Sequence, residues 1–436
     1  MAASPLIMVP HNVRATITLD KDKILRVLGP ARIHVEDGCI RLLGIVLCKG
    51  QEIWISRYRS YGIKAIDVAN LSIFIGEGGG IEEPLPGEEP IDVWEAIGKE
   101  IVDRGGRVVV LGPVESGKTS FATLLSNLGI EHGLKSAIID ADIGQCDLAP
   151  PGFIAMKIMD RKVLWLREVT GDVKRFIGFI TPSPGIAIAR IMASIVELIN
   201  IAEERGANLI IVNTDGWFGD LASIQFKIQL IKSVKPASIA IMGGNSFCKP
   251  FADTFSKFSA TKVYCIPSPA VVKSRSRDDR RQLRKVNYAQ YLRNAKKRCF
   301  NINDIAVLDS CLFNGPPYQE GIEALKSRLG IDIVMASKYE DVLVLALQSD
   351  TKIDSLQLGH ENIYVIKPSF ARGALVALLN EKMEEVGMGV IDSVDLVKKE
   401  FCILTEYDGD VRGVVIGRIM LNEEFADKGK IVKCVI

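Results

Sequence analysis

The stretch from Arg107 to Thr119, RVVVLGPVESGKT, decides the fold. An apolar run typical of a buried strand leads into a glycine-rich loop that matches G-x-x-x-x-G-K-[ST], and a helical pattern follows over about 118–132. The backbone N–H groups of such a loop converge on phosphate oxygens, and the N-terminus of the next helix attracts the same anion. The stretch therefore predicts a nucleotide site; the alternative is a chance glycine-rich turn.

Two side chains of this loop have predicted chemical roles. Lys118 would place its charge on the β- and γ-phosphates, and Thr119 would offer its hydroxyl to Mg²⁺. The predicted nucleotide-binding residues are Gly112, Pro113, Val114, Glu115, Ser116, Gly117, Lys118, Thr119 and Ser120.

The pattern around the loop predicts an α/β fold. Apolar strands alternate with helical segments over residues 91–302, which is typical of a mostly parallel sheet covered by helices on both faces. Residues 1–90 read as a small N-terminal β domain followed by a solvated linker, Ile75–Pro90. Residues 303–436 read as a C-terminal β or α+β domain with one helix near Gly373–Val386.

Composition narrows the class of protein. The 436 residues include 54 Lys and Arg against 53 Asp and Glu, which excludes a uniformly basic nucleic-acid coat. The most apolar long stretch, Ile186–Ala202, is interrupted by charged residues, so no membrane span or membrane partner is expected. Nine scattered cysteines without a CxxC pair, and no signal peptide, predict free buried thiols in a reducing, cytoplasmic setting.

A second motif, Asp140-Ala-Asp142-Ile-Gly144-Gln145, ends the strand after the glycine-rich loop. Ligands of open α/β sheets bind at such strand ends. Two carboxylates two residues apart can hold Mg²⁺ or its water shell, and one could accept a proton from a hydroxyl nucleophile. The alternative is a solvated turn in which Asp caps a helix.

A third motif, Asn213-Thr214-Asp215-Gly216-Trp217, follows another apolar strand and is expected at the same edge of the sheet. An exposed Trp is suited to stacking on a nucleic-acid base. A Trp packed in the core fits the sequence equally well.

The fourth signal is a basic segment over residues 273–298, with eleven Lys and Arg against two Asp. Arg277, Arg280, Arg281 and Arg284 share one face of the predicted helix. Such a face could neutralise a transferring phosphoryl group or grip a nucleic-acid backbone. A solvated basic helix is the alternative.

Together the four motifs, in this order, resemble the polynucleotide 5′-hydroxyl kinase family, the RNA kinases related to the pre-mRNA cleavage-complex and rRNA-processing kinases. The resemblance covers about residues 91–298 and includes D-x-D-x-G-Q, T-x-G-W and an R-x-x-x-R lid. It implies ATP (or GTP) and Mg²⁺ as cofactors. The 5′ end of single-stranded RNA or DNA would be the substrate, and RNA-processing proteins are possible partners.

The resemblance also implies residue roles. Lys118, Asp142, Arg280 and Arg284 would be catalytic, with Asp142 as the general base. Thr119, Asp142 and Gln145 would hold Mg²⁺, partly through water. The RNA-binding residues would be Thr214, Trp217, Arg277 and Arg281; the last two also satisfy R-x-x-x-R, so the register of the lid stays open.

Two other functions stay open on the sequence. An ATP-binding scaffold of an RNA-processing complex would keep the same binding residues with little turnover. A P-loop GTPase or ATPase could also use D-x-D-x-G, although Gly243-Gly244-Asn245-Ser246 lacks the lysine and aspartate of N-K-x-D. RNA against DNA, and ATP against GTP, are not readable from these motifs.

Overall fold

The computed structural model describes all residues except 1–6, 9–11, 183–184, 272–273, 351–361 and 429–433. Lys273, the first basic residue of the lid segment, therefore lies outside the described residues. The chain forms two compact units. The first contains residues 1–142, 155–173 and 192–276, and the second contains 143–154, 174–191 and 277–436. This division does not test the domain boundaries expected at residues 90 and 302.

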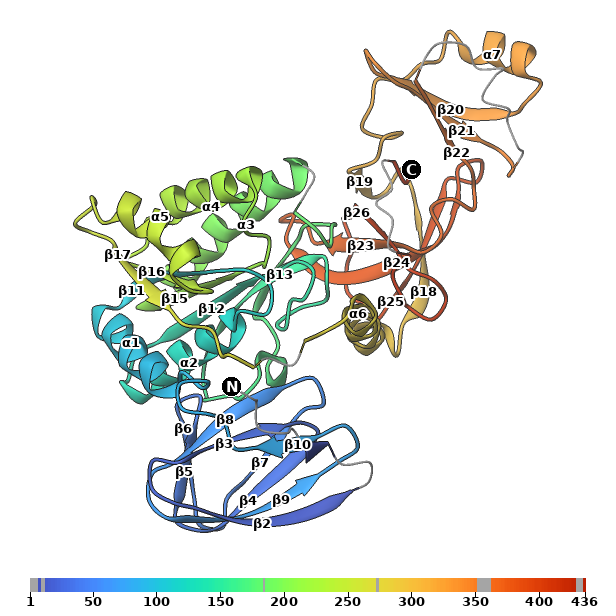
Figure 1. The fold of residues 1–436 in the computed structure, drawn as a ribbon. Coiled ribbons are helices and arrows are strands. Elements are labelled where there is room, and N and C mark those ends of the chain that lie inside the picture. The colour runs from blue at the N-terminus through green and yellow to red at the C-terminus, as the bar shows by residue number, and fades with distance from the viewer. Residues whose placement is uncertain (1–6, 9–11, 183–184, 272–273, 351–361, 429–433) are drawn as a thin grey trace. The chain divides into compact units, whose positions relative to one another are not determined.

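A central sheet confirms the predicted α/β fold (Figure 1). Its strands follow the order β14-β13-β12-β15-β11-β16-β17, with β14 (Val173–Phe176) at one edge. Strands β12, β15, β11, β16 and β17 are parallel to one another, and β13 is antiparallel to β12. The strands are β11 (Gly106–Leu111), β12 (Ser136–Ala141), β13 (Phe153–Ile158), β15 (Leu209–Thr214), β16 (Ser238–Met242) and β17 (Lys262–Ile266). The antiparallel β13 was not expected, because its sequence has no separate periodic signal.

Helices cover both faces of this sheet (Figure 1). They are α1 (Ile91–Arg104), α2 (Lys118–Glu131), α3 (Gly185–Glu204), α4 (Leu221–Val234) and α5 (Asn245–Phe255). Strands β12 and β15 are buried at every position, as expected of strands covered on both sides. In parallel strands the carboxyl ends meet at one edge, which brings the motifs after β11, β12 and β15 together.

Helix α3 is the one described helix that is long and apolar enough to cross a membrane. It has 20 residues and a mean hydropathy of 1.7 over its most apolar window, 39% of which is buried. The core helix of a soluble protein can have the same length and hydropathy, so these two values alone do not indicate a membrane span. The absence of a membrane partner stays a prediction.

The N-terminal β domain consists of two packed sheets around one core. One has the order β1-β10-β3-β8-β5-β6 and the other β2-β9-β4-β7. The strands are β1 (Ile7–Met8), β2 (Val13–Leu19), β3 (Ile24–Leu28), β4 (Ala31–Asp37), β5 (Cys39–Leu42), β6 (Ile45–Cys48), β7 (Glu52–Ile55), β8 (Ser60–Ala65), β9 (Ala69–Ile75) and β10 (Gly80–Glu82).

The segment Ile75–Pro90, expected to be a solvated linker, is instead fixed to this domain. Strand β10 pairs with β3, and Arg26 lies fully buried on β3. Its guanidinium donates to Glu82 at 2.8 Å, Glu88 at 3.4 Å and Glu89 at 2.5 Å. The glutamates of this segment predicted a solvent-exposed linker. Sequence composition does not show that one buried arginine binds three of them.

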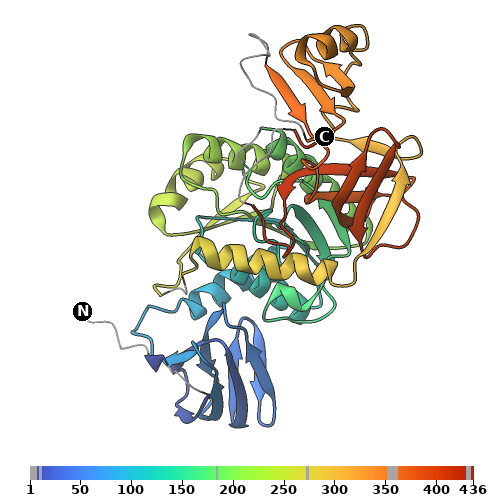
Figure 2. The same ribbon diagram turned by 90° about the vertical axis from the view of Figure 1, so that its right-hand side faces the viewer.

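The second unit contains helix α6 (Arg277–Leu292), seen end to end in Figure 2, and two further sheets. The larger has the order β18-β25-β24-β23-β26-β19 and the smaller β20-β21-β22. The other elements of this unit are β18 (Lys296–Asn301), β19 (Ala306–Leu308), α7 (Ile322–Leu329), β20 (Ile333–Lys338), β21 (Leu343–Leu347), β22 (Ile363–Ile366), β23 (Ala374–Leu379), β24 (Glu385–Asp395), β25 (Glu400–Thr405) and β26 (Gly413–Met420). A 3-10 turn at Leu166–Glu168 belongs to the first unit.

The helix expected near Gly373–Val386 was wrong. Strands β23 and β24 occupy that segment, and the described helix of this region is α7. Strand β23 is buried at all six positions. A short apolar run that is buried on both sides has no period that separates a strand from a helix.

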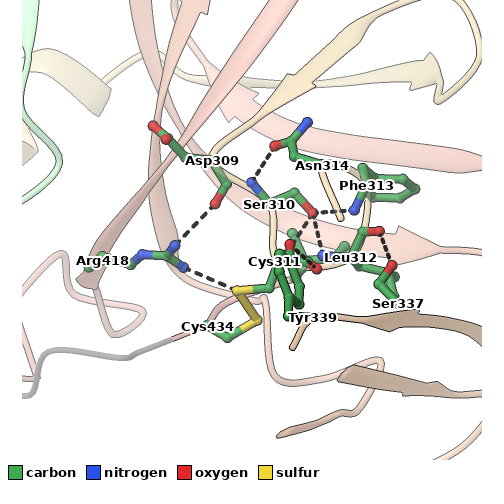
Figure 3. The surroundings of a disulfide bond; sticks show 11 residues. Asp309, Ser310, Cys311, Leu312, Phe313, Asn314, Ser337, Tyr339, Arg418 and Cys434 are labelled. Atoms are coloured by element: carbon green, nitrogen blue, oxygen red, sulfur yellow. Dashed lines mark hydrogen bonds between the residues drawn. A yellow bond between two sulfur atoms is a disulfide. The ribbon is translucent and has the colours of Figure 1, made fainter. Parts of the chain in front are cut away.

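The expectation of free thiols was also wrong. Disulfides join Cys39 to Cys48, Cys248 to Cys265, Cys299 to Cys402, and Cys311 to Cys434; the ninth cysteine, Cys146, is buried and outside these disulfides. Figure 3 shows the last pair, with Arg418 donating to the Cys311 sulfur at 3.9 Å and to the Asp309 carbonyl at 3.2 Å. The paired cysteines are 9 to 123 residues apart in the sequence. A disulfide requires two cysteines to be close in the folded chain, and the sequence alone does not show which ones are.

Candidate nucleotide and acceptor site

The glycine-rich loop has the backbone that a phosphate cradle requires. Gly112 and Gly117 have φ angles of 146° and 95°, and both lack room for a side chain. A Cβ on Gly112 would lie 2.7 Å from the Met242 carbonyl oxygen, and one on Gly117 would lie 2.8 Å from the Trp94 ring. The loop is therefore fixed by β16 and α1 as well as by its own sequence.

Lys118 is held inside this loop. It is buried, and its ammonium donates to the Pro113 carbonyl at 2.6 Å. Burial lowers the pKa of Lys118 to about 8, while the nearby Asp142 carboxylate acts to raise it. Lys118 and Asp142 therefore lie close enough to interact electrostatically.

Polar groups from three strand ends meet beside the loop. The Asn213 amide donates to the Thr119 hydroxyl at 3.3 Å and to an Asp140 carboxylate oxygen at 3.0 Å. The same Asp140 oxygen accepts from the Asp142 backbone at 3.4 Å. Among the residues that the structure describes, none donates a hydrogen bond to the buried side-chain oxygen of Asn213. Hydroxyl, amide and carboxylate oxygens are the ligands that Mg²⁺ prefers, so this group of side chains fits the metal.

The turn after β15 contacts the glycine-rich loop directly. A Cβ on Gly216 would lie 2.5 Å from the Val114 side chain and 3.0 Å from its backbone nitrogen. Trp217 is half-buried, stacks on Phe226 at 6.2 Å between ring centroids, and donates from its indole to Asp220 at 2.6 Å. The indole of Trp217 therefore packs on the protein, while the residue stays partly accessible. Its stacking on a nucleic-acid base stays a prediction.

Thr214 is the last residue of β15, at the strand end where its motif was expected. It is buried, and its hydroxyl donates to the Val110 carbonyl at 2.9 Å. In this arrangement Thr214 fixes the end of β15 to β11 and positions the turn. Its predicted contact with RNA is not tested by this bond.

The basic segment forms α6 up to Leu292, and its last three residues belong to β18. The four arginines divide into two pairs: Arg277 and Arg281 are exposed, whereas Arg280 and Arg284 are half-buried. Arg284 donates to Asp427 at 2.9 Å. The sequence placed all four on one face, but only the Arg280/Arg284 register lies on the packed side of the helix.

The packed side of α6 holds the loop that follows the D-x-D-x-G-Q motif. The buried Asn287 amide donates to the Cys146 and Ala149 carbonyls at 3.3 and 3.4 Å. The Tyr288 hydroxyl donates to the Pro151 carbonyl at 3.1 Å. Gln145 lies in this loop, where its amide donates to the Gly144 carbonyl at 2.8 Å. Gln145 and the lid arginines therefore belong to the second unit, and Lys118, Thr119, Asp142 and Trp217 to the first.

Two polar residues of the first unit's part of the site were not predicted. Asn213 lies in the third motif but had no predicted role, and Lys227 lies outside all four motifs. Lys227 is fully buried on α4 and donates to Asp215 at 2.7 Å. A lysine inside the apolar stripe Phe226, Leu230, Ile231 was the available signal, because a charge on a core-facing position needs a partner.

A parallel α/β sheet with a phosphate loop, acidic strand ends and a buried loop lysine defines a P-loop nucleotide-binding protein. Residues 112–294 match the family model described as the P-loop of the mRNA cleavage and polyadenylation factor CLP1. This match confirms the resemblance to the polynucleotide 5′-hydroxyl kinase family that the four motifs indicate.

Curated relatives cover most of the chain. A polyribonucleotide 5′-hydroxyl-kinase of Pyrococcus furiosus is 26% identical over 328 residues, which are 75% of this chain and 90% of that protein. One of Methanocaldococcus jannaschii is 27% identical over 332 residues, 74% of this chain and 89% of that protein. A CLP1 homolog of Arabidopsis thaliana is 22% identical over 195 residues, 43% of this chain and 44% of that protein.

The fold of the chain is similar to that of a solved structure. A solved complex of wild-type Clp1p with Pcf11p contains a chain that superposes with a TM-score of 0.64 at 14% identity, covering 95% of this chain and 99% of that one. At this identity the likeness concerns the fold, including the terminal domains.

Proposed function

We propose that this chain is an ATP-dependent polynucleotide 5′-hydroxyl kinase that transfers the γ-phosphate of ATP to the 5′-hydroxyl of RNA. The observation that carries the proposal is the meeting of the Lys118 loop, the Asp140 and Asp142 carboxylates and the Gly216–Trp217 turn at one sheet edge. The matched archaeal relatives bear the name of this activity. A cytoplasmic location and protein partners in RNA processing go with the proposal as expectations.

Charge neutralisation is the first task of the site. The loop N–H groups, the α2 N-terminus and the Lys118 ammonium bind the β- and γ-phosphates. Mg²⁺ would be held by Thr119, Asn213 and the two carboxylates of the D-x-D motif, with Gln145 as a further ligand through water. When bound, the metal would neutralise charge that develops on the phosphate oxygens.

Proton transfer and positioning are the other tasks. Asp142 would accept the proton of the attacking 5′-hydroxyl, as a carboxylate within reach of the nucleophile can. Trp217 would support the terminal base by stacking, and the Arg280/Arg284 register of α6 would provide the lid charge. The exposed Arg277 and Arg281 would contact the RNA backbone instead.

The direct test is transfer of labelled γ-phosphate from ATP to 5′-hydroxyl oligonucleotides, with RNA and DNA of the same sequence in parallel. The wild-type chain should label RNA, and Asp142→Asn should lower kcat by about 100- to 10,000-fold while ATP still binds. No transfer by the wild type to either substrate would contradict the proposal. Full activity of Asp142→Asn would leave the kinase but remove the assigned base.

A further inference from the structure

We propose that Lys227 is a positioning residue of this kinase: through Asp215, its buried ammonium fixes the Gly216–Trp217 turn that receives the RNA end. The inference rests on the proposed function, because the turn matters here as an acceptor site. Lys227 itself touches neither nucleotide nor RNA in this view. It acts on the substrate only through the backbone that Asp215 holds.

The ion pair is buried on both sides. Lys227 on α4 is 0% exposed, and Asp215 is 5% exposed. The ammonium donates to one Asp215 carboxylate oxygen at 2.7 Å and lies 4.7 Å from the centre of the Phe226 ring. A buried ion pair is a poor source of stability compared with apolar packing, so its presence calls for another explanation.

Asp215 uses its second oxygen on the turn. That oxygen accepts the Trp217 backbone N–H at 2.7 Å. A carboxylate that binds a buried cation on one side and a backbone N–H on the other fixes both the position and the direction of the peptide. The sequence Asp215-Gly216-Trp217 is thereby held from below by α4.

The turn that Asp215 holds lies against the glycine-rich loop. Gly216 is in contact with Val114 of the phosphate loop, so the turn cannot move toward that loop. On the other side the Trp217 indole stacks on Phe226, the residue next to Lys227, with rings 26° apart. One short segment of α4 therefore supports both the backbone and the ring of the turn.

The pair also balances charge near the phosphates. Burial is the main cause of the low pKa of Lys118; Asp142 raises that pKa, Lys227 lowers it and Asp215 raises it. Without Lys227, the Asp215 carboxylate would stand uncompensated near an incoming triphosphate. Removal of both charges keeps the balance and removes the anchor, so a paired substitution separates positioning from charge.

The test uses the double variant Asp215→Asn/Lys227→Met in the full chain. The asparagine oxygen can still accept the Trp217 N–H, but nothing fixes it from α4. The matched control, Glu100→Gln/Lys262→Met, removes an exposed carboxylate–lysine ion pair in the same unit. Affinity for a fluorescent 5′-hydroxyl RNA in the presence of ADP, KM for RNA, KM for ATP and Tm are measured for each.

The double variant should bind RNA about tenfold more weakly and raise KM for RNA about tenfold, with KM for ATP changed less than about twofold. The control should match the wild type. Unchanged RNA affinity in the folded double variant would overturn the proposal, and so would equal losses in both KM values that follow a fall in Tm. If the wild type binds RNA but transfers no phosphate, the proposed function fails while the affinity comparison still decides the role of Lys227. If the wild type does not bind RNA, the proposed role of Lys227 is overturned.

Discussion

The carboxyl edge of the central sheet and helix α6 both carry groups suited to phosphate charge, but they are built differently. At the sheet edge, backbone geometry places every group: Lys118 follows a loop whose glycines have no space for side chains, and Asn213 bridges Thr119 and Asp140. On α6, the chemistry depends on which side of a helix four arginines occupy. The first kind of site is preorganised; the second depends on a partner such as Asp427.

The largest expected effect separates the two arginine registers. Arg280→Gln/Arg284→Gln should lower kcat by about 1,000-fold or more, because arginines that neutralise a transferring phosphoryl group contribute that much. Arg277→Gln/Arg281→Gln is the matched control with the same charge change, and it should mainly raise KM for RNA. Single-turnover transfer measured for both double variants decides between them. Equal losses in kcat would show that the packed side of α6 does not define the lid.

Reduction of the disulfides should affect the two units unequally. The second unit contains pairs separated by 103 and 123 residues, and the first contains pairs separated by 9 and 17. Loop-closure entropy predicts about 4–5 kcal/mol for each long loop and about 2.5–3 kcal/mol for each short one. Proteolysis with and without reductant, followed by mass spectrometry, should cut the second unit first, while ADP binding persists. Earlier cleavage in residues 1–142 would contradict this ranking.

Removal of the partner of Arg284 should cost stability. Asp427→Asn replaces a carboxylate that is 3% exposed and accepts from the Arg284 guanidinium at 2.9 Å. The free energy of unfolding should therefore fall by about 1–3 kcal/mol. Chemical denaturation measures the change. Asp410→Asn changes an exposed acidic residue of the same unit; it is the control and should have little effect. A stability equal to that of the wild type would mean that Arg284 finds another acceptor.

The smallest effect concerns the pH dependence of nucleotide affinity. Lys118 has a pKa lowered to about 8 by burial, and phosphate binding favours its charged form, so binding takes up a proton at higher pH. ADP affinity should therefore fall about tenfold between pH 7 and pH 9. In the free protein the lowered pKa makes the unfolding free energy rise from about pH 8 toward the ordinary lysine range. Calorimetric titration in two buffers measures affinity and proton uptake; a flat profile would contradict the low pKa.

The features predicted correctly from the sequence are those that a local sequence pattern determines. The P-loop strand and helix, the D-x-D-x-G-Q turn and the α/β class were predicted, because local pattern fixes them. Strand β23, the disulfides and the Arg26 cluster were not, because each depends on segments distant in the chain. The ion pair between Lys227 and Asp215, only 12 residues apart, was not predicted either. The sequence does not show which acidic residue the fold places beside a buried lysine.

The attachment of the N-terminal β domain has a practical consequence. The Asn127 amide on α2, the helix that begins at the phosphate loop, donates to the Leu43 carbonyl at 2.7 Å, and Tyr61 donates to the Leu164 carbonyl at 2.8 Å. A chain shortened to start at Ile91 would lose these acceptors and donors and uncover apolar surface on α2. The amino-terminal portion should therefore be retained in any minimal active fragment, even though the sequence suggests a convenient place to cut.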